Sequence, residues 1–222
     1  MRQPFYALRS IKAVNPRHYG LNLMLQKQSS AKKASIIAMT AALYAIFFAA
    51  STSALPFMPN FAVLFLPIIL LGVFPIWFGW WGLAGVMVGA FVGGAFSEGL
   101  GVLGIFECVV ALIIYLINWA LIPKKAAEDG SKPRIVALLA LYTVSLLVGT
   151  AYIVWQYTVL PALFPADLMP IITLTTFAFN LPIVLLACPA LIKTVSPRMR
   201  NWGVYTGNLR EWLNRNKTST KA

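Results

Sequence analysis

Residues 65–94 read FLPIILLGVFPIWFGWWGLAGVMVGAFVGG, a stretch without a single charged side chain. A helix that crosses a bilayer needs roughly 20 predominantly apolar residues, and this stretch is longer than that. Pro75 lies within it, and proline removes a helical hydrogen bond and clashes with the preceding turn. We therefore expect Pro75 to divide the stretch into a short span over residues 61–73 and a longer one over residues 76–96.

The composition of the whole chain agrees with a membrane protein. Of its 222 residues 59% are hydrophobic and only 11% are charged, and the mean hydropathy is +0.77. Soluble domains carry about 25% charged residues, so lipid must replace water around much of this chain. Four further spans are expected at residues 35–55, 101–122, 135–160 and 170–195. The predicted fold class is all-α: a polytopic membrane protein with six transmembrane helices in one bundle (residues 34–195), between a basic tail (1–33) and a second basic tail (196–222) with a short interfacial helix at residues 208–213.

The positions of the basic residues predict the orientation. The 18 Lys and Arg side chains all fall in residues 1–33, in residues 123–134 or from Lys193 onward. Lys and Arg in loops that flank membrane spans remain in the cytoplasm, and six crossings place all three clusters on that side. We therefore expect a multi-pass protein of the cell membrane with both termini cytoplasmic. Anionic membrane lipids account for the charge of +12, and no nucleic-acid partner is expected.

Polar groups inside the spans are the candidate binding residues. Glu107 is the only ionisable group within a confident span, and such groups usually face a cavity or a partner. Polar stripes also run along the fourth span (Glu107, Asn118), the fifth (Tyr142, Ser145, Tyr152, Gln156) and the sixth (Thr173, Thr176, Asn180). Three stripes that converge would form a ligand cavity in the outer half of the bundle. An alternative remains open, in which these groups bond to backbone or to neighbouring helices and only hold the bundle together.

The motifs of common enzymes are missing from the sequence. It contains no GxxxxGK[ST], HExxH or GxSxG, and its single histidine, His18, lies in the first tail. Metal-centred hydrolysis lacks its ligands and a Ser-His mechanism lacks its base. We expect a protein that is not an enzyme, with no cofactor and no metal site.

Two patterns resemble the substrate-binding (S) component of energy-coupling factor (ECF) transporters. The first is Ala34-x-x-x-Ala38-x-x-x-Ala42 in the first span, and the second is the run from Phe65 to Gly94, in which prolines precede regularly spaced glycines. The resemblance implies a carrier that captures a vitamin-like or amine-bearing small molecule at the outer face. It also implies partners in trans: a transmembrane coupling subunit that docks on Ala34, Ala38 and Ala42, and cytoplasmic ATPases that drive uptake.

In this reading the link over residues 55–60 covers the pocket. The substrate-binding residues are expected to be Glu107, Glu98, Asn60, Tyr152, Gln156, Thr173, Thr176 and Asn180. Glu98 and Asp167 lie in the external turns and make the outer face acidic, which favours a cationic or amine-bearing ligand. The nickel and cobalt branch of the family is disfavoured, because it requires an N-terminal histidine.

Two other functions are compatible with the sequence. A membrane scaffold or sensor would dock cytoplasmic partners through the basic tails. A self-contained secondary transporter would usually show an inverted repeat, and none is evident.

Overall fold

The computed structural model describes residues 30–54, 56–58, 61–98, 102–123, 132–159 and 165–219. The elements in chain order are α2 (Ser30–Ala54), β1 (Pro56–Met58), β2 (Phe61–Ala62), α3 (Pro67–Glu98), α4 (Val102–Leu121), α5 (Lys132–Val159), η1 (Ala166–Leu168), α6 (Met169–Asn201) and α7 (Leu209–Ser219). Within this part of the chain, α2 to α6 make five helices that are long and apolar enough to cross a membrane. The predicted all-helical class is confirmed, with one short antiparallel pairing of β1 and β2 beside it.

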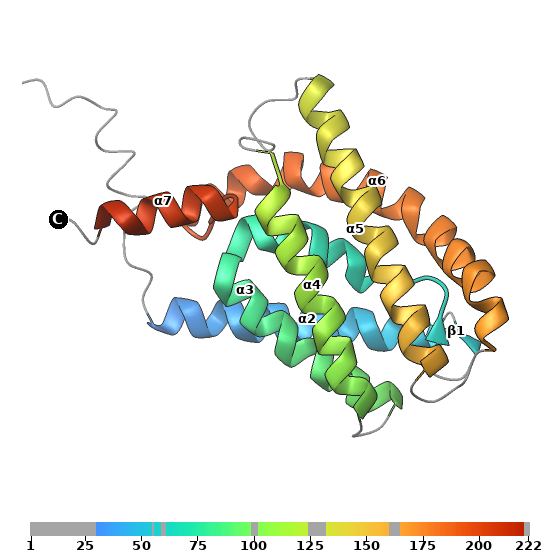
Figure 1. The fold of residues 1–222 in the computed structure, drawn as a ribbon. Coiled ribbons are helices and arrows are strands. Elements are labelled where there is room, and N and C mark those ends of the chain that lie inside the picture. The colour runs from blue at the N-terminus through green and yellow to red at the C-terminus, as the bar shows by residue number, and fades with distance from the viewer. Residues whose placement is uncertain are drawn as a thin grey trace, which may run out of the picture.

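The expected break at Pro75 is wrong. Helix α3 (Pro67–Glu98) takes in most of both spans that the sequence separated, and Pro75 lies inside it. The non-helical residue is Gly79, with φ of 51° and ψ of −130°, a conformation that residues with a side chain rarely adopt. The chain turns sharply there, so that a first limb (residues 67–78) and a second limb (residues 80–98) run in different directions (Figure 1).

Side chains of other helices bond the carbonyl oxygens of the first limb. Pro75 has no N–H, so Leu71 O lacks its usual helical donor. The side-chain amide of Asn118, on α4, donates to that oxygen at 3.1 Å. The Tyr142 hydroxyl, on α5, donates to Gly72 O at 2.9 Å. These bonds stabilise the first limb, because a bilayer offers no water to satisfy an exposed carbonyl.

Residues 202–208, between α6 and α7, close the far end of the first limb. The backbone N–H of Thr206 donates to Ile76 O at 3.0 Å and to Trp77 O at 3.1 Å, and the N–H of Gly207 donates to Ile76 O at 2.9 Å. These carbonyls immediately precede the break, where the chain no longer brings helical donors to them. A segment from the far end of the sequence therefore completes the broken helix.

Helix α2 packs closely against the second limb, as the spaced glycines predict. A Cβ at Gly85 would overlap Thr40 Oγ1, and a Cβ at Gly93 would lie 2.8 Å from Phe48 Cβ. The contacts advance in the same order along both segments, so α2 and the second limb are parallel. The absence of side chains at Gly85, Gly89 and Gly93 therefore lets α2 approach the second limb closely.

The other segments alternate in direction. Tyr115 OH on α4 donates to Gly79 O, and Cys108 Sγ contacts Met87 O at 3.5 Å, so α4 runs antiparallel to the second limb. Helix α5 runs antiparallel to α4, and α6 runs parallel to the first limb. The order α2, first limb, second limb, α4, α5, α6 therefore reverses direction at each step.

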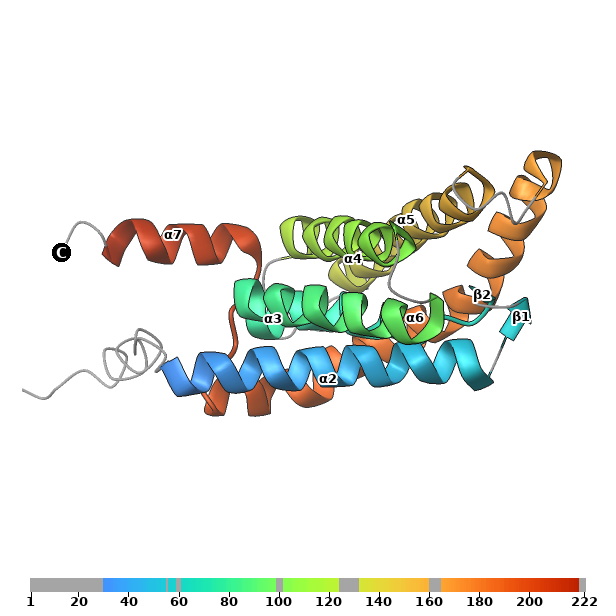
Figure 2. The ribbon, with the colours of Figure 1, turned by 90° about the horizontal axis from the view of Figure 1, so that it is seen from below.

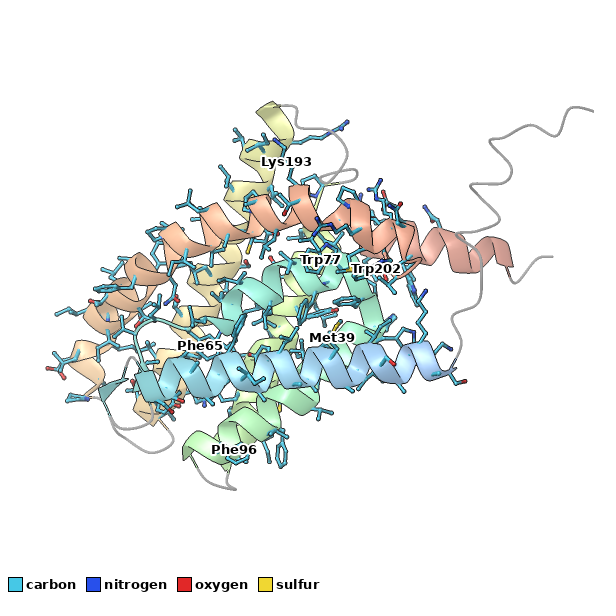
Figure 3. The ribbon with its side chains drawn as sticks, turned by 180° about the vertical axis from the view of Figure 1, so that it is seen from behind. Met39, Phe65, Trp77, Phe96, Lys193 and Trp202 are labelled. Carbon is cyan, nitrogen blue, oxygen red and sulfur yellow. The ribbon has the colours of Figure 1, made fainter. Side chains whose placement is uncertain are left out.

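As a result, the start of α2 and the end of α6 lie together. Lys32 Nζ donates to Trp202 O and to Gly203 O. Figure 3 shows Trp202 and Trp77 toward this end of the bundle and Phe65 toward the opposite end. We call these the Trp202 end and the Phe65 end.

Helix α7 begins where the short helix after the last span was expected. Asn208 Oδ1 accepts a hydrogen bond from Glu211 N at 2.9 Å, while Glu211 Oε2 accepts one from Asn208 N at 3.3 Å. This reciprocal pair is a capping box, which fixes the start of a helix. Trp212 packs against Trp80 and Trp119, with ring centroids 6.1 and 5.7 Å away. From this anchored start α7 projects beyond α3 and α4 (Figure 2).

Candidate functional site

A cavity lies between α2, the first limb of α3, α4, α5 and α6. Its empty volume, counting the open space at its mouth, is about 600 Å³. Its lining residues are Tyr44, Phe48, Thr52, Ala62, Phe65, Ile68, Leu71, Glu107, Val110, Ile114, Leu146, Gly149, Thr150, Ile153, Tyr157, Thr176 and Asn180.

The polar and apolar parts of the wall lie at different depths. On α4, Glu107 is nearest the Phe65 end, and Val110 and Ile114 follow toward the Trp202 end. Helix α6 adds Thr176 and Asn180 at the Phe65 end. Since α4 rises about 1.5 Å per residue, Ile114 lies roughly 10 Å deeper than Glu107. The wall therefore changes from polar near the Phe65 end to apolar in the middle of the bundle.

Glu107 and Gln156 form a buried polar pair. Glu107 is 2% exposed and Gln156 is fully buried. The Gln156 side-chain amide donates to Glu107 Oε1 at 3.4 Å, across the contact between α5 and α4. Gln156 Oε1 has no hydrogen-bond partner in the described part of the chain. A carboxyl at this depth is costly unless a cavity, a partner or a ligand compensates it, which makes Glu107 the central candidate binding residue.

Asn180 lines the cavity, and its side-chain amide also bonds the chain segment that precedes α3. Its Oδ1 accepts from Phe65 N at 2.8 Å, and its Nδ2 donates to Val63 O at 2.7 Å and to Thr176 O at 2.8 Å. Both amide hydrogens are therefore in use. Asn180 thus holds residues 63–65, which precede α3, beside the cavity. Thr176 Oγ1, on the same wall, has no partner among the residues described.

A second side chain holds the same segment. Leu66 N donates to Ser51 Oγ, at the end of α2, at 2.9 Å. Phe65, which lies between the two anchored positions, forms part of the cavity wall and packs edge-on against Phe48 at 5.3 Å between ring centroids. Residues 61–66, expected as the start of a span, are instead β2 and an irregular stretch, because their backbone groups are bound by α2 and α6.

Three of the predicted binding residues line the cavity: Glu107, Thr176 and Asn180. A fourth, Gln156, contacts Glu107 without lining the cavity. Tyr152 and Thr173 do not line the cavity. The Tyr152 ring lies 5.7 Å from that of Trp155, and Thr173 Oγ1 donates to Met169 O of its own helix at 2.8 Å. Asn60 and the side chain of Glu98 lie outside the described residues, as do Leu55 and Pro59 of the same link.

Other polar residues of the predicted stripes hold the fold together. Asn118 and Tyr142 bond the first limb of α3, and Ser145 Oγ donates to Tyr142 O at 3.2 Å. For these three residues the alternative reading, in which polar groups join helices, describes what the structure shows.

Sequence reasoning missed several lining residues, among them Thr150 and Tyr157 of α5. Their signal was available, because residues 146, 149, 150, 153 and 157 recur at helical spacing on one face. Of the polar residues that the sequence singled out on this helix, Tyr142 lies on the same face but nearer the Trp202 end, where it bonds Gly72 O, and Tyr152 lies on a neighbouring face.

The predicted docking residues lie on the outside of the bundle. Ala34, Ala38 and Ala42 are exposed on α2, together with the larger side chains of Met39 and Leu43. The small residues that face inward from the second limb are the glycines at positions 85, 89 and 93. Helix α2 therefore uses one face for the bundle and leaves the alanine face uncovered by the rest of the described chain.

Comparison with protein-family models, curated proteins and solved structures gave no match to this chain. In the described part of the chain, no three His, Cys, Asp or Glu side chains lie close enough together to hold a metal ion. The site consists of one carboxyl, amides, hydroxyls and an apolar wall, a set suited to binding a small molecule.

Proposed function

We propose that this chain is the membrane-embedded, substrate-binding subunit of an ECF-type ATP-driven importer, and that its substrate is a small molecule bound in the cavity. The observation that carries the proposal is a buried carboxyl, contacted by a buried amide, on the wall of a largely apolar cavity between five helical segments. A purely structural bundle gains nothing from a carboxyl in that position, since burial of a charge is unfavourable. A carrier requires such a group to recognise its ligand.

The same proposal includes six crossings of the cell membrane with the Trp202 end in the cytoplasm. The reversal of direction at each of the six segments supports it, with the two limbs of α3 as separate crossings. The first limb and the segment before it would together cross the bilayer, because a twelve-residue helix alone covers only about 18 Å. Lys32, Lys33, Arg198 and Arg200 lie near the Trp202 end, where the positive-inside rule requires basic residues.

Coupling to ATP hydrolysis would occur through partners. The exposed face formed by Ala34, Ala38 and Ala42 offers a surface on which another helix can approach closely, as small residues allow in membranes. A transmembrane coupling subunit would dock there and connect the carrier to cytoplasmic ATPases. Membrane lipids would cover the remaining apolar faces.

The test is purification of the tagged full chain from its native membranes in mild detergent, with mass spectrometry of all co-purifying proteins and small molecules. Recovery of an ATPase pair, a second membrane subunit and a bound small molecule is the expected result. Recovery of the chain without ATPases and without a ligand would refute the proposal.

A membrane scaffold or sensor is the second candidate, favoured by the projection of α7 from the bundle and by the 64% exposure of Trp202. Removal of residues 215–222 tests it, because this deletion spares the segment over 202–208 that completes α3. A scaffold would lose its cytoplasmic partners, whereas a carrier would retain its ligand. Deletion from residue 198 onward would not discriminate, since it removes the bonds to Ile76 and Trp77.

A further inference from the structure

The cavity wall shows which chemistry its occupant must have. At the Phe65 end, Glu107 contributes the one carboxyl group among the described lining residues. Two buried acceptors lie in the same region: the hydroxyl of Thr176, which is on the cavity wall, and Oε1 of Gln156, which contacts Glu107 through its amide but does not line the cavity. Both side chains are more than nine-tenths buried, and neither acceptor has a partner within the described residues.

The carboxyl of Glu107 and the hydroxyl of Thr176, both on the cavity wall, favour a ligand that donates hydrogen bonds. A buried acceptor without a donor costs about 1–3 kcal/mol, and a carboxylate bonds most strongly to a charged donor. The sequence provides no Lys, Arg or His between residues 34 and 122 or between residues 135 and 192. A positive charge at this depth would therefore come with the ligand.

The inner part of the cavity has the opposite character. Leu71, Ile114 and Leu146 form its innermost wall, and Phe48 and Val110 lie between them and the polar end. Ile114 is tightly packed, since its Cδ1 would lie only 2.4 Å from a Cβ added at Gly149. The hydroxyl of Thr150, which also lines this region, donates to Leu146 O of its own helix at 2.8 Å. The region therefore fits an aliphatic or aromatic body.

We infer that the ligand is an amphipathic amine or ammonium compound, bound with its cationic head against Glu107 at the Phe65 end and its apolar body directed toward Ile114. This inference rests on the proposed function, and it adds the charge, the shape and the orientation of the substrate. Gln156 positions the carboxyl through its amide, and Thr176 accepts a further hydrogen bond from the head group.

The experiment compares three probes that share one apolar body: 2-phenylethylamine, 2-phenylethanol and phenylacetate. A fourth probe, methylammonium, has the charge without the body. Affinities are measured by calorimetry on the full chain in lipid nanodiscs. The amine is expected to bind at least about tenfold more tightly than the other probes, because a charge-assisted hydrogen bond contributes about 1.5–3 kcal/mol.

Two variants test the assignment to Glu107. Glu107→Gln keeps the shape and removes the charge, and it is expected to weaken binding of the amine about tenfold to a hundredfold. Asp167→Asn removes an equal charge from an exposed turn residue and is expected to leave the affinity unchanged. The probe comparison uses the wild-type chain alone, so it remains decisive if Glu107→Gln fails to fold.

The outcomes separate this inference from the proposed function. Binding of phenylethanol or phenylacetate as tight as that of the amine, or an unchanged affinity in folded Glu107→Gln, would overturn the inference and leave a small-molecule carrier in place. A co-purified ligand without a basic group would do the same. If no probe binds and no small molecule co-purifies, both conclusions fall.

Discussion

Gly79→Ala is the most direct test of how α3 is built. Gly79 has φ of 51° and ψ of −130°, and a β-carbon is strained in that conformation at a cost of about 1–3 kcal/mol. The added Cβ would also lie 2.6 Å from Thr206 Cγ2 and 3.1 Å from Trp119 Cζ2. Overpacking of this kind costs about 1–3 kcal/mol. The expected loss in the free energy of unfolding is therefore about 2–6 kcal/mol.

The assay is equilibrium unfolding in mixed micelles, followed by circular dichroism. Gly104→Ala is the matched control, because a Cβ there meets nothing within 4 Å and alanine favours a helix by up to about 1 kcal/mol over glycine. The two alanine variants should change the stability in opposite directions. Equal stability of the two variants would refute the reasoning about the break.

The double variant Gly79→Ala with Thr206→Ala separates the two causes. Thr206→Ala removes the two side-chain atoms that the new Cβ would approach most closely, while the backbone N–H bonds to Ile76 and Trp77 remain. Partial recovery of stability is expected, equal to the steric part of the loss. The part that stays lost contains the backbone strain, the remaining contact with Trp119 Cζ2 and the lost hydrogen bond from Thr206 Oγ1 to Trp77 O. Stability equal to that of Thr206→Ala alone would show that the positive φ costs nothing.

Three further predictions concern the bonds and surfaces around the site. Asn118→Leu leaves Leu71 O without its donor and should lower the free energy of unfolding by about 1–3 kcal/mol, while the ligand affinity stays unchanged. Equilibrium unfolding measures the stability and calorimetry measures the affinity. A loss of affinity at unchanged stability would contradict a structural role for Asn118. Asn180→Asp keeps the acceptor for Phe65 N but loses the amide that donates to Val63 O. Ligand dissociation, measured by stopped flow, should accelerate about tenfold. An unchanged rate would mean that the segment bound by Asn180 does not control exit from the cavity. Ala38→Trp should abolish co-purification of the coupling subunit and leave the ligand affinity unchanged. Co-purification at the wild-type level would exclude the face formed by Ala34, Ala38 and Ala42 as the docking surface.

Composition and periodicity predicted the helical class and the position of nearly every helix, because a span must be apolar along its whole length. They misplaced the break in α3. Proline is the residue that usually ends a helix, yet Pro75 stays helical, since Asn118 supplies the missing donor to Leu71 from a distant part of the sequence. The break lies at Gly79, where residues 202–208 cap the limb, and no local pattern indicates that contact.

The candidate site was predicted only in part for a similar reason. Glu107 stood out because a carboxyl in an apolar span is rare, and Gln156 and Thr176 followed from their helical spacing. Asn180 lies where spacing placed it, but its hydrogen bonds go to the backbone near Phe65. Sequence alone cannot separate a polar group that faces a ligand from one that faces a carbonyl, because both need the same side chain on the same face.

The cap on the first limb of α3 also sets an order of events during synthesis. Thr206 follows its acceptor Trp77 by 129 residues, so the ribosome inserts the broken helix long before the residues that complete it exist. Until residue 207 has emerged, the carbonyls of Ile76 and Trp77 must rely on water or on the insertion machinery. A nascent chain that stalls after α6 would thus carry α2 to α6 and still leave the carbonyls at the end of the first limb of α3 without their donors.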